Sequence, residues 1–364
     1  MTRLQEVRRE VRGAPRTWLV TGAAGFIGSA LVEELLSLGQ RVVGLDNFST
    51  GSRGNLLEAA AAASGSGSGS FHFVEGDLCR AADLDEACRG VDVVLHQAAL
   101  GSVPRSIDDP EATHRNNVDG FVNLLQALRR HGVRRLVYAS SSSVYGDHPA
   151  LPKVEEVTGA PLSPYAASKV AGELYAGVFA RVYGIEAVGL RYFNVFGRRQ
   201  SPEGPYAAVI PRWVRALLKG EPCVVYGDGE TSRDFCYVDN VVQANLLAAA
   251  APAEAVTRQV FNVAGGECTT LAALFAALRD GLAPRSPAAA AARLQHADFR
   301  PGDVRHSLAS IDKARRVLGY APTHTVAEGL RAALDWYVAD LSAPRDGAPP
   351  PVAAHAPRAV ETHG

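Results

Sequence analysis

The chain has 364 residues, 47% of them hydrophobic, and a formal charge of −1 from 37 Lys and Arg against 38 Asp and Glu. This composition excludes a fully disordered chain and is typical of one enlarged or two ordinary globular domains. Charges of both signs are interspersed along the sequence. We therefore expect no nucleic acid and no anionic membrane among its partners.

The cysteines lie far apart and none forms a C-x-x-C pair, so the sequence predicts neither a metal site nor a disulfide framework. They are Cys79, Cys88, Cys223, Cys236 and Cys268. The first 16 residues mix Glu with Arg and contain no apolar segment of a signal peptide, and no apolar run approaches membrane-spanning length. We expect a cytoplasmic protein.

Strand and helix patterns alternate along the first half of the chain, after an N-terminal extension of residues 1–15. A strand, a glycine-spaced turn and an apolar helix occupy residues 17–38 and lead into a second strand, Arg41–Asp46, which completes a βαβ unit. Later strands and helices are expected at Phe71–Glu75, Val91–His96, Glu111–Arg130 (helix), Arg135–Ala139, Pro164–Tyr183 (helix) and Glu186–Leu190. The pattern predicts an α/β fold with a doubly wound parallel (Rossmann) sheet over residues 16–192.

The alternation weakens after Phe193, where a smaller C-terminal lobe is expected over residues 193–341. Within it the chain is expected to return to the sheet near residues 259–263, and helices are expected at Leu271–Leu282 and Val326–Val338. The low-complexity run AAAAASGSGSGS, residues 59–70, is expected to form a flexible surface loop. Residues 342–364 are expected to be a disordered tail.

A phosphate-binding turn is predicted at Gly22, Gly25 and Gly28, because these glycines of TGAAGFIG lie between a strand and a helix. Asp46 ends the second strand, where its carboxylate can accept both ribose hydroxyls of an adenosine and would repel a 2′-phosphate. Asp77, in VEGD, is placed to accept a hydrogen bond from the adenine amine. These residues predict a site for NAD rather than NADP.

A tyrosine base is predicted at Tyr165, since Lys169 lies one turn further along the same expected helix. The Lys ammonium and the positive charge of a bound nicotinamide would favour the phenolate and lower the pKa of the phenol. The preceding strand ends in ASSSSVYG, which places several hydroxyls at the carboxyl edge of the sheet. Chemistry alone does not select among residues 140–143.

The motifs TGAAGFIG, LDN, EGDL, HQAALGSVPRS, ASSSSVYGD, SPYAASK and LRYFNVFGRRQ resemble those of nucleoside-diphosphate-sugar 4-epimerases in the extended short-chain dehydrogenase/reductase family. The resemblance covers residues 16–337. It is strongest to bacterial UDP-N-acetylglucosamine 4-epimerases, which share HQAALGSVPRS and GDGETSRDFCYV. It implies an NAD-dependent enzyme of polysaccharide biosynthesis that acts on a UDP-sugar, commonly as a homodimer.

The resemblance also assigns the site residues. It selects Ser141 as the catalytic hydroxyl beside Tyr165 and Lys169. It assigns NAD binding to Gly22, Gly25, Phe26, Ile27, Asp46, Asn47, Asp77, Leu78, Gln97, Ala98, Asn117, Tyr165, Lys169 and Tyr192. The nucleotide sugar is expected to be held largely by the smaller lobe. Its binding is assigned to Gly101, Ser102, Ser141, Ser142, Asn194, Ala208, Val209, Tyr226, Arg233, Arg300, Asp303 and Ser307.

Small residues at two positions favour a sugar with a bulky C2 substituent. Ser307 stands where family members restricted to unsubstituted hexoses carry Tyr, and Ala208 stands where others carry Asn. Gly101 replaces a Lys of many hexose epimerases and marks the subgroup that accepts N-acetyl sugars. The resemblance therefore implies interconversion of UDP-N-acetylglucosamine and UDP-N-acetylgalactosamine.

In the implied reaction Tyr165 removes the O4 proton, directly or through Ser141, while the C4 hydride passes to the nicotinamide. The 4-keto sugar then turns about a diphosphate held by Arg233 and Arg300 and recovers the hydride on its other face.

Three other interpretations stay open: an epimerase of UDP-glucose or UDP-hexuronic acids, a UDP-glucuronate decarboxylase, and a non-catalytic NAD-binding scaffold. A dehydratase is disfavoured, because Ser142 and Ser143 stand where dehydratases carry an Asp–Glu pair. The expected helices Glu111–Arg130 and Pro164–Tyr183 are candidates for a dimer interface.

Overall fold

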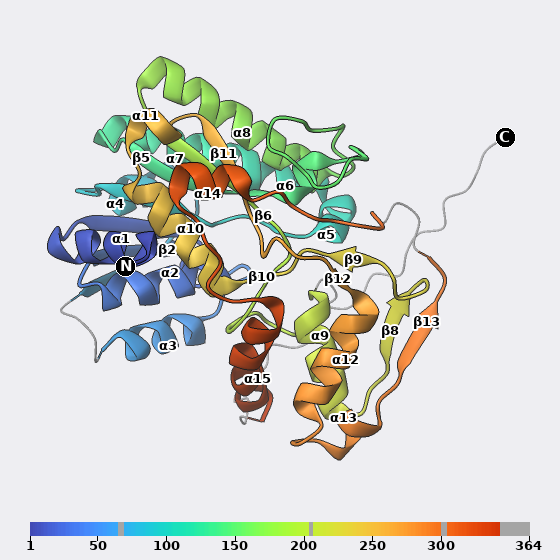
Figure 1. The fold of residues 1–364 in the computed structure, drawn as a ribbon. Helices are drawn as coiled ribbons and strands as arrows, with labels where there is room; N and C mark the ends of the chain where they lie inside the picture. The colour runs from blue at the N-terminus through green and yellow to red at the C-terminus, as the bar shows by residue number, and fades with distance from the viewer. Residues whose placement is uncertain (65–68, 204–206, 300–303, 343–364) are drawn as a thin grey trace.

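The computed structural model describes residues 1–64, 69–203, 207–299 and 304–342. Its centre is a seven-stranded sheet in the order β11-β6-β5-β4-β1-β2-β3, with every neighbouring pair parallel (Figure 1). The strands are β1 (Thr17–Thr21), β2 (Arg41–Asp46), β3 (Ser70–Glu75), β4 (Val93–His96), β5 (Arg135–Ser141), β6 (Glu186–Tyr192) and β11 (Gln259–Val263). The expected doubly wound Rossmann sheet is confirmed.

Both faces of the sheet are covered, which explains why its central strands read as nearly continuous apolar runs. One face packs against α2 (Phe26–Ser37), α3 (Arg53–Ala63) and α10 (Val238–Ala250). The other packs against α4 (Ala81–Ala87), α7 (Gly120–His131) and α8 (Pro164–Tyr183). Strand order reverses between β1 and β4, and ligands of doubly wound sheets bind at the carboxyl ends of the strands beside such a point.

The N-terminal extension forms a helix, α1 (Arg3–Gly13), capped by the Thr2 side chain. Its buried face, Leu4, Val7 and Val11, belongs to the core around α10. The buried Gln40 side chain ties this helix to the sheet, since its amide donates to the Val11 carbonyl at 2.9 Å and its oxygen accepts from the Trp18 indole at 3.1 Å. The extension is thus part of the packed domain.

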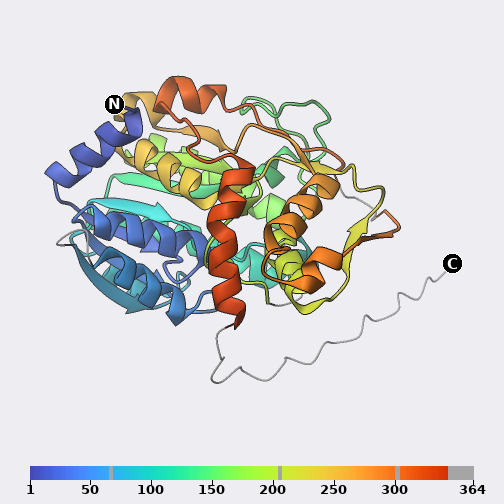
Figure 2. The same cartoon turned by 60° about the horizontal axis from the view of Figure 1, so that its bottom comes forward.

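A smaller lobe lies beside the sheet and contains its own short strands and helices (Figure 1). Its elements are β7 (Val195–Phe196), α9 (Val209–Lys219), β8 (Cys223–Tyr226), β9 (Ser232–Arg233), β10 (Cys236–Tyr237), β12 (Thr269–Thr270), α12 (Leu271–Leu282), α13 (Pro287–Ala291) and β13 (Leu294–Ala297). Figure 2 shows α15 (Val326–Ser342) standing between this lobe and the sheet domain. Two further short helices, α11 (Ala253–Val256) and α14 (Asp312–Leu318), lie on the sheet domain near β6 and β11.

The expectation of a loop at residues 59–70 is wrong for residues 59–63, which form the end of α3. Alanine has the highest helix propensity, Ser52 caps the helix at Gly54 N, and Ala59 and Ala63 are buried, so the alanine run continues the helix. β3 begins at Ser70, and residues 65–68 lie outside the described residues.

The expected helix at 111–130 is interrupted. It consists of α6 (Pro110–His114), a π-helical turn (Arg115–Asp119) and α7, preceded by α5 (Val103–Asp108). The end of the chain also differs from expectation by one residue, because Ser342 still belongs to α15. The rest of the expected tail, 343–364, lies outside the described residues.

Within the described ranges, none of the helices has the length and apolar character required to span a bilayer. The five cysteines, all in that part of the chain, are free thiols. The same residues contain no cluster of His, Cys, Asp and Glu that could hold a metal ion.

Candidate functional site

The turn between β1 and α2 is built on contacts that only glycine permits. Gly22 adopts φ +68°, and a Cβ atom there would lie 2.7 Å from the Ala98 backbone nitrogen. A Cβ atom on Gly28 would overlap the Gly22 carbonyl oxygen. Gly25 caps α2 without a side-chain hydrogen bond, so the N-terminus of this helix presents backbone N–H donors where an anion can bind.

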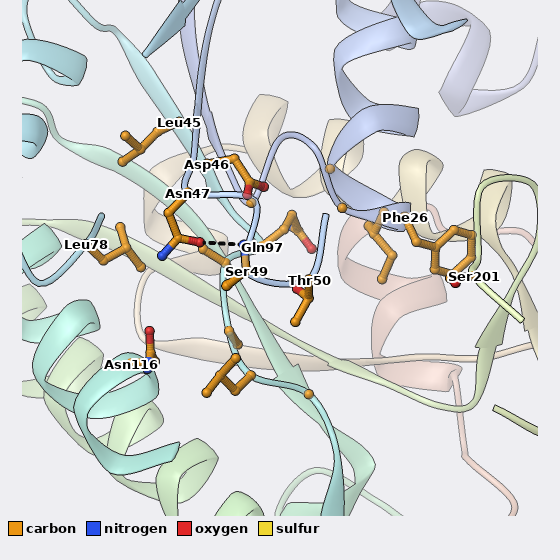
Figure 3. A pocket seen from close by; sticks show the side chains of 18 of the residues that line it. Phe26, Leu45, Asp46, Asn47, Ser49, Thr50, Leu78, Gln97, Asn116 and Ser201 are labelled. Carbon is orange, nitrogen blue, oxygen red and sulfur yellow. Dashed lines mark hydrogen bonds between the residues drawn. The ribbon is translucent and has the colours of Figure 1, made fainter. Parts of the chain in front are cut away.

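A cavity of about 440 Å³ opens at this turn, at the carboxyl ends of β1, β2 and β3 (Figure 3). In Figure 3, Asp46, Asn47 and Leu78 lie toward one end of the cavity, and Phe26 and Ser201 lie at the other. Most of the residues predicted to bind the dinucleotide line it, namely Gly22, Gly25, Phe26, Ile27, Asp46, Asn47, Asp77, Leu78, Gln97 and Ala98. The glycine cradle, the uncapped helix and the strand-end carboxylates fit NAD.

Two carboxylates face this cavity, and their pKa values are shifted in opposite directions. Asp46 accepts from the N–H groups of Ala24 at 2.9 Å and Phe48 at 2.8 Å, but burial outweighs these bonds and raises its pKa. At Asp77 burial acts in the same direction, yet bonds from Cys79 N at 2.8 Å and Asn47 Nδ2 at 2.9 Å prevail and lower its pKa. Both carboxylates keep acceptor capacity for a ligand hydroxyl or amine.

Asn117 is not among the residues that line either the dinucleotide cavity or the larger cavity described below; its neighbour Asn116 lines the dinucleotide cavity. The Asn117 side chain accepts from Leu100 N at 2.8 Å and donates to Ser168 Oγ at 3.1 Å, so it braces the cavity wall against α8. Both asparagines lie in the π-helical turn, which rotates residues away from the faces that regular helical periodicity predicts. Contact of Asn117 with NAD stays a prediction.

A second cavity, of about 950 Å³, brings the three predicted catalytic side chains together. Tyr165 and Lys169 lie one turn apart at the start of α8, where Pro164 occupies the first turn and Ser163 caps the helix at Ala166 N. Lys169 Nζ lies 5.8 Å from the centroid of the Tyr165 ring. Phe26, Ile27, Gln97 and Gln200 line both this cavity and the dinucleotide cavity, so the two are neighbours across a shared wall.

The electrostatics of this group are set by burial. Burial raises the pKa of the Tyr165 phenol, and a hydrogen bond with Ser141 opposes the rise. Burial lowers the pKa of Lys169 to about 8, against the attraction of Glu173. Lys169 Nζ donates to the Ala139 carbonyl at 2.9 Å, which holds the ammonium beside the phenol. The protein's own groups thus raise the pKa of the Tyr165 phenol, which differs from the expectation that Lys169 lowers it, because burial outweighs the opposing hydrogen bond with Ser141.

The serines at the end of β5 and just after it have different hydrogen-bond partners, which distinguish them from one another. Ser140 Oγ donates to Glu173 Oε1 at 2.5 Å. Ser143 donates to Ser141 Oγ through both its N–H, at 3.1 Å, and its hydroxyl, at 2.9 Å. Ser141 is left as an acceptor whose own proton is available to Tyr165 or a substrate oxygen. This arrangement favours Ser141 as the catalytic hydroxyl.

The residues predicted to bind the sugar nucleotide divide among three cavities. The large cavity is lined by Gly101, Ser102, Ser141, Ser142, Asn194, Arg233 and Ser307, together with Tyr192, predicted to contact NAD. A neighbouring cavity of about 420 Å³ is lined by Val209 and Tyr226 and shares Asn194 and Arg233. Ala208 instead lines the dinucleotide cavity. Arg300 and Asp303 lie outside the described residues.

Two arginines of the smaller cavity were missed by the sequence interpretation. Arg212, on α9, and Arg305 line it with Arg233, and Arg305 pairs with Asp228 at 2.5 Å. Guanidinium groups have the charge and geometry to bind a diphosphate. The sequence signal was weak, because the three arginines lie far apart in the chain and exposed arginines are common.

Comparison with known proteins agrees with this geometry. The model of the NAD dependent epimerase/dehydratase family matches residues 18–264. The chain belongs to this family. NAD is therefore its cofactor, and the residues around the glycine turn are those that would hold it.

Similar members of the family differ in the sugar that their names specify. A UDP-glucose 4-epimerase of Mycolicibacterium smegmatis is 41% identical over 326 residues, covering 88% of this chain and 97% of that protein. A UDP-N-acetylglucosamine 4-epimerase of Methanobrevibacter ruminantium, solved with UDP-N-acetylmuramic acid, is 38% identical with a TM-score of 0.80, covering 90% and 99% of the two chains. A UDP-glucuronic acid 4-epimerase of Bacillus cereus, solved with UDP-glucuronic acid and NAD, is 30% identical with a TM-score of 0.78, covering 89% and 99%.

The glycine turn yields a direct test. Gly28→Ala places a methyl group against the Gly22 carbonyl, so the turn must open and NAD affinity should fall by at least about tenfold. Gly13→Ala on α1, where a Cβ meets nothing within 4 Å, is the matched control and should bind NAD normally. Calorimetric titration of NAD into both variants measures the difference. Normal affinity in Gly28→Ala would show that the cofactor binds elsewhere.

Proposed function

We propose that this protein is an NAD-dependent nucleotide-sugar 4-epimerase that interconverts UDP-N-acetylglucosamine and UDP-N-acetylgalactosamine through a 4-keto sugar. The observation that carries the proposal is the group formed by Ser141, Tyr165 and Lys169 in a cavity of about 950 Å³ adjoining the dinucleotide cavity. An intact base beside the cofactor site also argues against a non-catalytic NAD-binding scaffold.

In the proposed reaction the Tyr165 phenol accepts the proton of the sugar O4 and later returns it. Lys169, held by the Ala139 carbonyl, lowers the cost of the phenolate, and Ser141 can relay the proton between O4 and the phenol. Bound NAD would supply the acceptor of the C4 hydride and then its donor. Because the proton and the hydride both return to the sugar, the enzyme leaves its cofactor unchanged after each cycle.

Inversion at C4 requires a nucleotide held firmly and a sugar held loosely. Arg212, Arg233 and Arg305 surround the smaller cavity and can fix a diphosphate through bidentate hydrogen bonds. The large cavity next to it has small side chains at Gly101, Ser102 and Ser141. A sugar anchored through its diphosphate thus has room to present either face toward the cofactor site.

The same small side chains support the N-acetyl sugar as substrate. Ser307 lines the large cavity together with Tyr165, and a Cβ atom on Gly101 would meet nothing within 4 Å. The relative solved with UDP-N-acetylmuramic acid is named for an N-acetylated substrate. The names of other relatives specify UDP-glucose and UDP-glucuronate, which are the alternatives that the experiment must separate.

The substrate is identified by incubating the purified protein with UDP-glucose, UDP-N-acetylglucosamine and the uronic form of each, and following C4 inversion by proton NMR. We expect the highest kcat/KM for UDP-N-acetylglucosamine. Preference for another donor would overturn the N-acetyl assignment, and inversion of none of the four would overturn the proposed activity.

The base is tested separately with Tyr165→Phe. The substitution removes the ionisable hydroxyl and keeps the ring, so kcat should fall by about a thousandfold while the nucleotide sugar still binds. Stopped assays give kcat, and calorimetry gives the dissociation constant of the substrate. Near-normal turnover in this variant would assign the proton transfer to another group.

Selectivity is tested at Ser307. In Ser307→Tyr a phenol fills the space beside the sugar, so kcat/KM for UDP-N-acetylglucosamine should fall by about 10- to 200-fold while that for UDP-glucose is retained. Ser307→Ala keeps the space open and should turn over both. Equal losses on the two donors in Ser307→Tyr would argue against a gate at this position.

We also propose that the protein is a homodimer formed through α8. This helix exposes Leu174, Tyr175, Val178 and Val182, of which Leu174 is 67% and Val182 61% exposed. Such an apolar stripe on a helix is stabilised when a second copy covers it. The free thiols are typical of a reducing compartment, and we place the dimer in the cytoplasm.

The dimer is tested with Val178→Arg, which puts a charge in the centre of the stripe and should convert the protein to monomers in light scattering. Val317→Arg, on the exposed side of α14, changes the same residue type away from the stripe and should leave the dimer intact. A monomeric wild-type protein, or a dimeric Val178→Arg variant, would contradict this interface.

A further inference from the structure

A short segment of the smaller lobe reaches back over the dinucleotide cavity. We call residues 197–203, which follow β7, the strap. Gln200, Ser201 and Glu203 of the strap line this cavity, and Figure 3 shows Ser201 beside Phe26 at the end nearest the glycine turn. The strap thus lies close to where the dinucleotide phosphates would bind.

The strap is anchored by Arg199, whose side chain is only 3% exposed. Its guanidinium forms ion pairs with Glu33 on α2 and with Glu58 on α3, the latter at 3.2 Å. Arg199 also adopts φ +66°, a conformation that is unfavourable for a residue with a side chain. Such a backbone persists when its surroundings hold it in place, and here two carboxylates from the sheet domain do so.

The anchor extends to α15. The Trp336 indole donates to Glu58 Oε2 at 2.9 Å, the atom that also pairs with Arg199. The next residue of the same helix holds the strap itself, since Tyr337 OH donates to the Gly197 carbonyl at 3.0 Å. Helix α15 stands between the two parts of the molecule (Figure 2). The strap is therefore fixed from both sides.

We infer that Arg199, Glu58 and Trp336 are positioning residues that keep the strap closed over the dinucleotide cavity and so set the rate at which NAD leaves. The inference rests on NAD being the cofactor, which the family establishes, and is independent of which sugar the enzyme accepts. An ion pair is well suited to holding the strap, because breaking it leaves a buried guanidinium partly unpaired. Release of the strap is therefore costly and slow.

The inference is tested with Glu58→Gln and Trp336→Phe, which keep the approximate shapes of the side chains. Glu58→Gln removes the ion pair of Arg199 with Glu58 but leaves the one with Glu33, and Trp336→Phe removes the indole donor. Neither residue is among those that line the three cavities described above. Each variant, loaded with NAD and diluted, should release it about tenfold faster than wild type, and Arg199→Gln should release it faster still. Release is followed by exchange with a fluorescent etheno-adenine analogue of NAD, and epimerase activity should recover when NAD is added in excess.

Arg8→Gln is the matched control, because it breaks the 2.7 Å ion pair of Arg8 with Glu34, also on α2 but away from the strap. Its NAD release should equal that of wild type. Arg199→Lys keeps the charge but not the fork that reaches two carboxylates, and should restore part of the retention lost in Arg199→Gln. Wild-type release rates in Glu58→Gln and Trp336→Phe would overturn the inference, whereas faster release in these variants of a protein inactive on every sugar would overturn only the proposed activity.

Discussion

The close approach of two backbone segments in the first turn after β1 is the constraint on which the site depends. Gly28 lies against the Gly22 carbonyl, and Gly22 lies against the backbone at Ala98, after β4. These contacts bring α2, β1 and β4 together at the point where strand order reverses. An anion-binding helix terminus and the carboxyl edge of the sheet therefore face the same space.

Behind Tyr165 and Lys169, a buried network of polar side chains holds the wall of the large cavity in place. Glu173 accepts from Ser140 and from two nitrogens of Arg191, and Arg191 also donates to the Glu155 carbonyl. Glu173 lies one turn after Lys169 on α8, so the helix that carries Tyr165 and Lys169 is bonded to the neighbouring strands β5 and β6. Burial of this network keeps the positions of Ser141, Tyr165 and Lys169 precise.

Sequence alone predicted the strands of the sheet, because buried parallel strands read as short apolar runs, and it predicted the Tyr165–Lys169 pair, because helical spacing is regular. The turn glycines were recognisable for the same reason: their spacing is local. The π-helical turn around Asn117 was not, since such a turn leaves no periodic signal in the sequence. The alanine run was misjudged because its loop-like glycines and serines follow a stretch with strong helix propensity.

The strap was beyond the reach of the sequence, since its partners come from three distant elements, and nothing in GRRQ says which arginine is buried. The same arrangement sets an order in which these contacts can form as the chain is synthesised. The described residues of the sheet domain that line the dinucleotide cavity all lie at or before residue 116. The indole and the phenol that hold the strap belong to residues 336 and 337. The two hydrogen bonds from α15 can therefore form only after residue 337 has been synthesised, more than 200 residues after the sheet-domain lining of the cavity.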